Sequence, residues 1–361
     1  MGNWADLPPD LLNMILSKVF AKDRFSLVCR SWYLAATPYR YSVPCMMYYY
    51  RRNHSWKFHL HDSFFFTSFP QLNNSQIHCS KYGWLLMARN DNTLFFFDPS
   101  NNRALDLPCP NSFEYDKVFF FHPPTSPDCI VVTISETSRG IEIYLLKRGE
   151  YEWEHFKFKS RNPYFVSLAL PVLHRGQIIL LDMRGNLAIF NIINRRFVVN
   201  YECLGYEYGR IYNLIVNEHS LFTLKGKDAL FSVFVFHEER DVKVFGLSKV
   251  SKKIKWKLVE DIGDNVLYVS HTSCFVCTAE TKATANRIYF PLFHGDSPVF
   301  YSLSDKKYHS LNGDYSSNDA YGLKRLEFAA WVTPSLITTT SELNTTEFRW
   351  TSSPRVDQHG N

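Results

Sequence analysis

Few residues of this chain have the types and the spacing that chemistry requires. Cys274 and Cys277 form the only Cys-x-x-Cys pair in the sequence. A structural zinc site needs a second pair of ligands at a suitable spacing, and none follows. A redox pair normally lies at the start of a helix, whereas this pair lies in an apolar run that is typical of a strand. We therefore interpret both cysteines as core or half-buried thiols.

His59 and His61 are the next candidates, because alternate residues of a strand point to one face. They would supply half of a metal site, but no third ligand can be assigned, so we interpret them as surface histidines. The sequence also lacks a Gly-rich phosphate loop, a Gly-x-Ser-x-Gly elbow and a His-Glu-x-x-His motif. We predict no metal, no cofactor and no enzymatic activity, although a glycosidase that pairs carboxylates from separate strands stays open.

A basic stretch runs from Lys249 to Lys257. Lysines with an aromatic residue among them could serve as a nuclear-import signal or bind nucleic acid. The last lysines, however, alternate with Ile254 and Trp256, as they would in a half-solvated strand. Lysine on an edge strand also prevents strand-to-strand aggregation. We favour the edge strand and do not expect nucleic-acid binding.

The stretch from Asp6 to Phe20 is suited to binding a partner through apolar side chains rather than to catalysis. Pro8 and Pro9 stand where a helix would begin, a position at which a missing N–H costs nothing. Apolar side chains then recur along one helical face, at Leu11, Leu12, Ile15, Leu16, Val19 and Phe20. A second short helix is predicted over residues 24–36, so two or three small helices precede the rest of the chain.

These residues resemble an F-box, because Leu7-Pro8, the apolar face and the run Val28-Cys-Arg-Ser-Trp32 occur together and in order. The resemblance implies that the helices dock on a Skp-type adaptor, which connects the protein to a cullin–RING ubiquitin ligase whose other subunits carry the chemistry. The adaptor-binding residues that it implies are Leu7, Pro8, Leu11, Leu12, Ile15, Leu16, Val19, Val28, Cys29 and Trp32. The link from Val19 to Val28 is shorter than usual in this family, which leaves open a helical hairpin without a partner.

The composition is that of an ordinary globular protein, with 45% hydrophobic and 21% charged residues. The net charge of +5 is too small to indicate nucleic acid by itself. Residues 1–20 contain no uninterrupted apolar run, which excludes a signal peptide, and no segment is apolar enough to span a membrane. Eight scattered cysteines indicate a reducing compartment. We therefore expect a cytoplasmic or nuclear protein without a membrane partner.

Beyond Tyr48 the helical period ends, and short runs rich in Val, Ile, Phe and Tyr alternate with turn residues. A repeated unit of strand, turn, basic residue and second strand begins at Leu94, Ile141, Leu187, Val242 and Val299. These starts are 47, 46, 55 and 57 residues apart, close to the ~40–50 residues of a four-stranded propeller blade. Stacking such blades around an axis covers the faces that one small sheet leaves exposed.

A sixth unit can be assembled from both ends of the region, around Trp56 to Phe66 and around Glu327 to Val332, which would close the ring. Three motifs make the region similar to the β-propeller domain of unknown function that follows F-boxes in many plant proteins, sometimes named kelch-like. They are Gly83-Trp-Leu, Phe97-Asp-Pro with its trailing Asn-Arg-x-Leu-x-Leu-Pro, and Trp331-Val-Thr-Pro-Ser-Leu336. The sequence has no Gly-Gly and no Trp-Asp pair, so a propeller is a firmer prediction than a type of blade.

The predicted fold is mainly β, with a small α-helical F-box at residues 3–44, a β-propeller of six blades at 46–336 and a disordered tail at 337–361. The predicted function is substrate recognition in an SCF-type (Skp–cullin–F-box) ubiquitin ligase, in which the propeller holds an unknown target protein. Two alternatives stay open. One is a propeller scaffold that has lost adaptor binding, and the other is a carbohydrate- or nucleic-acid-binding propeller with a vestigial F-box.

Overall fold

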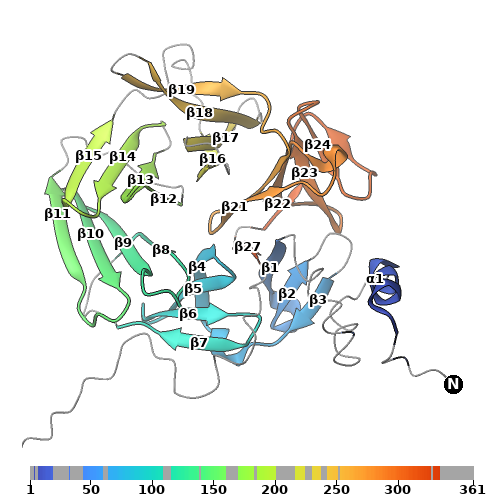
Figure 1. The fold of residues 1–361 in the computed structure, drawn as a ribbon, viewed down its shortest axis with the longest axis horizontal. Coiled ribbons are helices and arrows are strands. Elements are labelled where there is room, and N and C mark those ends of the chain that lie inside the picture. The colour runs from blue at the N-terminus through green and yellow to red at the C-terminus, as the bar shows by residue number, and fades with distance from the viewer. Residues whose placement is uncertain are drawn as a thin grey trace, which may run out of the picture.

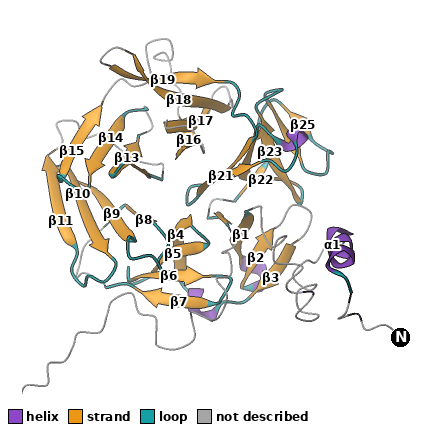
Figure 2. Ribbon diagram, viewed as in Figure 1, coloured by secondary structure: helices purple, strands orange, loops and turns teal. Residues whose placement is uncertain are grey.

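The computed structural model describes residues 4, 7–18, 32, 44–59, 64–108, 115–137, 140–159, 170–182, 185–200, 216–223, 230–236, 242–250, 253–326 and 328–333. Helix α1 spans Pro9–Lys18. Beyond residue 44, the helical segments of the described part are three-residue 3-10 turns, at Arg51–Asn53, Pro70–Leu72 and Lys282–Thr284. The rest of its regular structure consists of strands (Figure 2). None of the described helices is long and apolar enough to cross a membrane.

Five sheets of the described chain have four antiparallel strands each. The first contains β27 (Ala330–Val332), β1 (Cys45–Tyr50), β2 (Ser55–His59) and β3 (Phe64–Thr67). The second contains β4 (Ser75–Lys81), β5 (Trp84–Arg89), β6 (Leu94–Asp98) and β7 (Arg103–Asp106). The third contains β8 (Lys117–Phe121), β9 (Ile130–Thr137), β10 (Gly140–Lys147) and β11 (Glu154–Lys159).

The fourth sheet contains β12 (Val172–His174), β13 (Gln177–Leu181), β14 (Leu187–Asn191) and β15 (Arg196–Asn200). The fifth contains β16 (Val216–Thr223), β17 (Leu230–Phe236), β18 (Val242–Val250) and β19 (Lys253–Val259). The five sheets are successive hairpins, in which each strand pairs with its neighbour in sequence. Among the described strands, β27 alone pairs across most of the length of the chain.

The last sheet corrects the expectation of six like blades, because it has seven strands and an irregular order. It contains β20 (Asn265–Val269), β21 (Cys274–Thr278), β22 (Arg287–His294), β23 (Ser297–Ser302), β24 (Lys307–Ser310), β25 (Ser316–Ser317) and β26 (Lys324–Arg325). Strands β20 and β22 are parallel, since β21 folds back on the opposite edge of β20 before the chain returns. The structure therefore has five regular blades and one larger sheet.

The sheets are arranged in a ring, with β4, β8, β16, β21 and β27 toward its centre (Figure 1). The two ends of the β region meet in the first sheet, as the sequence predicts. Strand β27 pairs with β1 in the register Cys45↔Val332, Met46↔Trp331 and Met47↔Ala330. The ring is thus closed by a short strand that is the last of the described strands.

Side chains from neighbouring strands hold this closing strand. The Ser80 hydroxyl of the second sheet donates to the Trp331 carbonyl at 2.7 Å. From the seven-stranded sheet, the Ser273 hydroxyl accepts from the Trp331 N–H at 2.8 Å. The Trp331 indole N–H donates to the Val269 carbonyl at 3.2 Å. Because these groups are buried, each bond satisfies a polar atom that water cannot reach.

Position within a blade explains the residues that form each strand. Middle strand β6 reads Leu-Phe-Phe-Phe-Asp and is buried throughout, because the next blades cover both faces of it. Outer strand β11 reads Glu-His-Phe-Lys-Phe-Lys and alternates between half-buried and exposed residues. The apolar clusters lie between neighbouring sheets, for example Met46 and Trp331 of the first sheet against Tyr268 and Tyr289 of the last. Burial between blades is therefore the main apolar contribution to the ring.

Candidate functional site

Helix α1 presents an apolar face to solvent. Leu11 and Met14 are 42% and 58% exposed, Pro8 is exposed and Ile15 is half-buried. These residues, spaced three and four apart, share one side of the helix. Asp10 lies in the first turn, where a negative charge is favourable to the helix dipole. We call Pro8, Leu11, Met14 and Ile15 the α1 apolar face.

Two of the predicted adaptor-binding residues are buried rather than exposed to a partner. Leu12 is 1% exposed and Trp32 is 9% exposed. The Trp32 indole N–H donates to the Trp4 carbonyl at 2.8 Å, and the two indole rings lie 6.3 Å apart. These two buried side chains have little surface to offer a partner.

The other predicted adaptor residues divide between the described and undescribed parts. Leu7 is half-buried. Leu16 belongs to α1, but its side chain lies outside the described atoms, and Val19, Val28 and Cys29 lie outside the described residues. The predicted tail beyond residue 336 also lies outside them.

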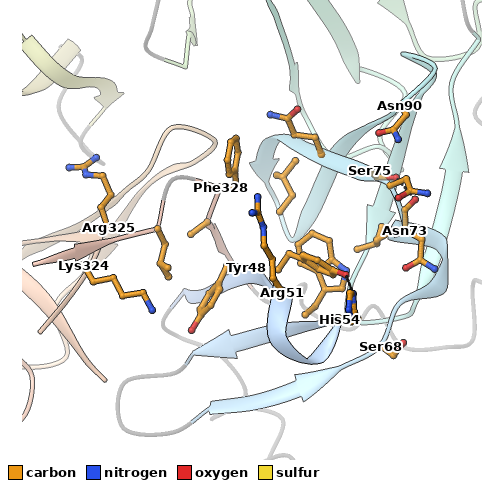
Figure 3. Close-up of a pocket in the computed structure, with 18 residues that line it drawn as sticks. Tyr48, Arg51, His54, Ser68, Asn73, Ser75, Asn90, Lys324, Arg325 and Phe328 are labelled. Atoms are coloured by element: carbon orange, nitrogen blue, oxygen red, sulfur yellow. Dashed lines mark hydrogen bonds between the residues drawn. The ribbon is translucent and has the colours of Figure 1, made fainter. Parts of the chain in front are cut away.

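The propeller carries an open groove of about 1160 Å³ (Figure 3). Four segments line it, namely β1 and β2 with the turn between them, the segment that enters β4, the turn after β5, and the segment from β26 to β27. The lining residues are Tyr48, Tyr49, Arg51, His54, Trp56, Ser68, Leu72, Asn73, Asn74, Ser75, Gln76, Ile77, Asn90, Lys324, Arg325, Leu326, Phe328 and Ala329. We call this space the β1–β26 groove.

Cations and aromatic rings stand together in this groove. Figure 3 shows Arg51 between Phe328 on one side and Asn73 and Asn90 on the other. Within the described part of the lining, four residues are Arg, Lys or His and none is Asp or Glu. Burial, as the largest cause, raises the pKa of Tyr48 to about 12, so this phenol is a neutral hydroxyl at pH 7. The groove can therefore offer positive charge, neutral hydrogen bonds and apolar contact to one ligand.

The two cysteines of the Cys-x-x-Cys pair, Cys274 and Cys277, have no sign of a functional role in the described part of the chain. Burial raises the pKa of Cys274 to about 12 and that of Cys277 to about 11, which keeps both thiols protonated and unreactive. No group of three or more His, Cys, Asp or Glu side chains that could hold a metal occurs within the described ranges. Both cysteines are half-buried on β21, which confirms their interpretation as structural thiols.

The histidine interpretation is wrong for His59. This residue is 7% exposed, and its ring lies 5.2 Å from that of Phe293. It belongs to the packing between the first and last sheets, which the alternation of one strand could not reveal. His61 lies outside the described residues.

The edge-strand interpretation of the basic stretch is confirmed. Strand β19 pairs only with β18 in its sheet of the described chain, and Trp256 is buried between exposed Lys255 and Lys257. The Trp256 indole N–H donates to the Gly185 carbonyl of the fourth sheet at 2.9 Å. The stretch therefore anchors one blade to the next.

Comparison with known families gives two matches. The F-box domain matches residues 4–38. The KIB1-4 beta-propeller matches residues 32–319. The two matches cover in turn the helical head and most of the ring.

Similar proteins occur in Arabidopsis thaliana. An F-box/kelch-repeat protein is 27% identical over 326 residues, which cover 86% of this chain and 90% of the relative. An F-box protein is 27% identical over 272 residues, which cover 71% of this chain and 67% of the relative. Among solved structures, the β-propeller domain of Cps50 (Swd1) from Myceliophteria thermophila aligns with a TM-score of 0.36 at 11% identity, covering 73% of this chain and 84% of that one.

Proposed function

The chain belongs to the KIB1-4 β-propeller family, and from this premise we propose that it is a substrate-recognition subunit of an SCF-type ubiquitin ligase. In this proposal the F-box head binds a Skp-type adaptor and, through it, a cullin–RING ligase. The ring binds the protein to be ubiquitinated. F-box proteins generally act as adaptors rather than enzymes, and we propose no catalytic residue here.

The observation that carries the proposal is the α1 apolar face on a head that matches an F-box. Leu11 and Met14 are large apolar side chains with 42% and 58% of their surface in water. An amphipathic helix of this kind binds a groove through apolar side chains at i, i+3 and i+4. We propose that Pro8, Leu11 and Ile15 contact the adaptor, and that Leu12 and Trp32 hold the helix in place.

The F-box assignment also suggests bounds and roles for the other parts of the chain. We propose residues 3–44 as the F-box, residues 46–336 as a propeller, and residues 337–361 as a tail. The target protein would bind to loops of the ring, where rigid strands position variable side chains. We propose the cytoplasm or the nucleus as the compartment, because ubiquitin ligases of this type act there.

The proposal is tested by adaptor pull-down with the full chain and its Leu11→Asp variant. An aspartate in an apolar interface costs several kcal/mol when it loses its water, a large part of the ~8 kcal/mol that a micromolar complex has in total. We expect the variant to lose adaptor binding and to melt with the parent, since Leu11 is partly exposed. Ile193→Asp is the matched control, because Ile193 is 85% exposed on the turn between β14 and β15.

Two results would contradict the proposal. One is an unchanged yield of adaptor with Leu11→Asp. The other is the absence of adaptor from the parent itself, which would favour a propeller scaffold whose F-box no longer binds. A glycan and oligonucleotide screen of the parent then separates that scaffold from a carbohydrate- or nucleic-acid-binding propeller.

A further inference from the structure

We propose that the β1–β26 groove binds an extended acidic segment of a partner protein. The inference rests on the proposed role of the ring in target binding, and it adds the place and the chemistry of recognition. It depends on three properties of the groove: two cations, Arg51 and Lys324, whose side chains have no partner within the described chain, amide side chains that are likewise unpaired there, and exposed aromatic rings.

The cations provide the charge that an acidic segment requires. The Arg51 and Lys324 side chains have no ion-pair or hydrogen-bond partner within the described chain. They come from opposite ends of the sequence, on the 3-10 turn after β1 and on β26. Arg325 and His54 also line the groove, and the His54 ring is hydrogen-bonded to the Tyr49 hydroxyl at 3.3 Å. Of the nearby acidic residues, Asp296 interacts electrostatically with Tyr48, and Glu327 lies outside the described residues.

The amide side chains provide hydrogen-bond donors and acceptors for an extended peptide backbone. The side chains of Asn73, Asn74, Gln76 and Asn90 are exposed, and none is hydrogen-bonded to another residue of the described chain. An amide side chain both donates and accepts, so it can pair with the N–H and the C=O of a peptide. Asn73 and Asn90 lie on the side of Arg51 that is away from Phe328 (Figure 3), where they could pair with a chain that lies along the groove.

The aromatic rings indicate that the segment also carries an apolar side chain. Phe328 is 59% exposed and Tyr49 is 41% exposed, although both lie at a concave surface. The Tyr49 ring packs edge-on against Trp56 at 5.4 Å, which fixes its orientation. A ligand that covers these rings removes apolar surface from water, and this favours binding.

The size of the groove and its modest charge select among ligand classes. Its volume of about 1160 Å³ exceeds the ~300–1,000 Å³ of typical small-molecule pockets. A nucleic-acid surface gains affinity from many phosphate contacts along a broad basic stripe, whereas this groove has four basic residues in a chain of net charge +5. An acidic peptide fits both the volume of the groove and its small number of basic residues.

The experiment selects ligands without assuming their sequence. A random ten-residue peptide library displayed on phage is enriched on the full chain and, separately, on its Arg51→Glu/Lys324→Glu variant. We expect sequences rich in Asp and Glu, with at least one apolar or aromatic residue, from the parent only. Lys255→Glu/Lys257→Glu is the matched control, because it reverses two exposed lysines on β19 and should enrich the same sequences as the parent.

Affinities are then measured by fluorescence anisotropy with the best selected peptide. We expect at least a tenfold loss of affinity with the groove variant and with a peptide in which Gln and Asn replace Glu and Asp. A copy with phosphoserine in place of one acidic residue distinguishes a phosphorylated source, which should bind tighter, from a carboxylate source. Equal thermal melting of the variants shows that the ring is intact.

The inference is overturned if no peptide is enriched, if the enriched peptides are not acidic, or if the groove variant enriches the same ones. A single-stranded RNA oligonucleotide that binds the parent more tightly than the peptide, and loses binding in the groove variant, would assign the groove to nucleic acid instead. Adaptor pull-down in parallel separates the two proposals: adaptor binding without peptide binding refutes the groove alone, and the reverse refutes the ligase role alone.

Discussion

At the scale of single residues, the ring contains a half-buried lysine whose charge is poorly solvated. Lys117 begins β8, one of the strands toward the centre of the ring. Burial lowers the pKa of Lys117 to about 8, because a poorly solvated ammonium is disfavoured. The unfolded chain has no such burial, so its lysine keeps a pKa near ~10.4. The charge therefore destabilises the folded state at neutral pH.

We expect Lys117→Met to increase the free energy of unfolding at pH 7, by roughly 1–3 kcal/mol. The sign follows from proton linkage, since between pH 8 and ~10.4 the unfolded parent binds more protons than the folded parent, and stability rises with pH there. The gain over the parent should thus shrink as the pH rises from 8 to 10. Urea unfolding at several pH values measures it, with the exposed Lys255→Met as control. A gain independent of pH would contradict the role given to the charge.

At the scale of elements, four of the five units read from the sequence occupy the same position in their blades, and the fifth, at Val299, lies in β23 of the seven-stranded sheet. The units at Leu94, Ile141, Leu187 and Val242 coincide with β6, β10, β14 and β18, the third strands of their sheets. Third strands pack between blades, so each carries several buried apolar residues that give a repeated signal. The parallel pairing of β20 with β22 could not be predicted from the sequence, because it depends on where the chain returns to the sheet and not on local composition.

The same limit applies to the candidate sites. The α1 apolar face could be predicted in part: the sequence predicts Pro8, Leu11 and Ile15, because they are neighbours on one helix, but not the exposed Met14. The β1–β26 groove could not, since Arg51 and Lys324 are separated by most of the chain and meet only through ring closure. Burial of Leu12 and His59 likewise depends on partners that local periodicity does not identify.

Strand β19 offers a test of how neighbouring blades are joined. Trp256 is 4% exposed, and its indole N–H bonds to Gly185 of the fourth sheet. We expect Trp256→Ala to cost ~3–5 kcal/mol, as for other buried large side chains. Trp256→Phe keeps most of the packing but leaves the Gly185 carbonyl unpaired, which should cost ~1–3 kcal/mol. Denaturant unfolding gives both values, and Lys257→Ala beside it should stay within ~0.5 kcal/mol of the parent. Equal effects of the three substitutions would show that β19 is not anchored.

At the scale of the whole molecule, the ring depends on a closing strand of three residues. Strand β27 is the innermost strand of the first sheet, next to β1. It lies between the second sheet and the seven-stranded sheet, which come from opposite ends of the β region. Trp331 is 4% exposed, with its ring 5.0 Å from that of Tyr268. Without β27, the inner edge of β1 would lose its pairing and expose a strand edge to aggregation.

Truncation separates the closing strand from the residues that follow it. A chain that ends at Ser335 keeps β27 and should melt with the parent, whereas a chain that ends at Lys324 lacks it and should melt at a lower temperature and aggregate. Trp331→Ala should fall between them, with a cost of ~3–5 kcal/mol. The exposed Tyr321→Ala, at 75% exposure, controls for loss of an aromatic ring at the surface. Thermal melting of these variants beside the full chain decides the matter. If the chain ending at Lys324 melts with the parent, β27 does not close the ring, because the register Met46↔Trp331 would then contribute nothing to its stability.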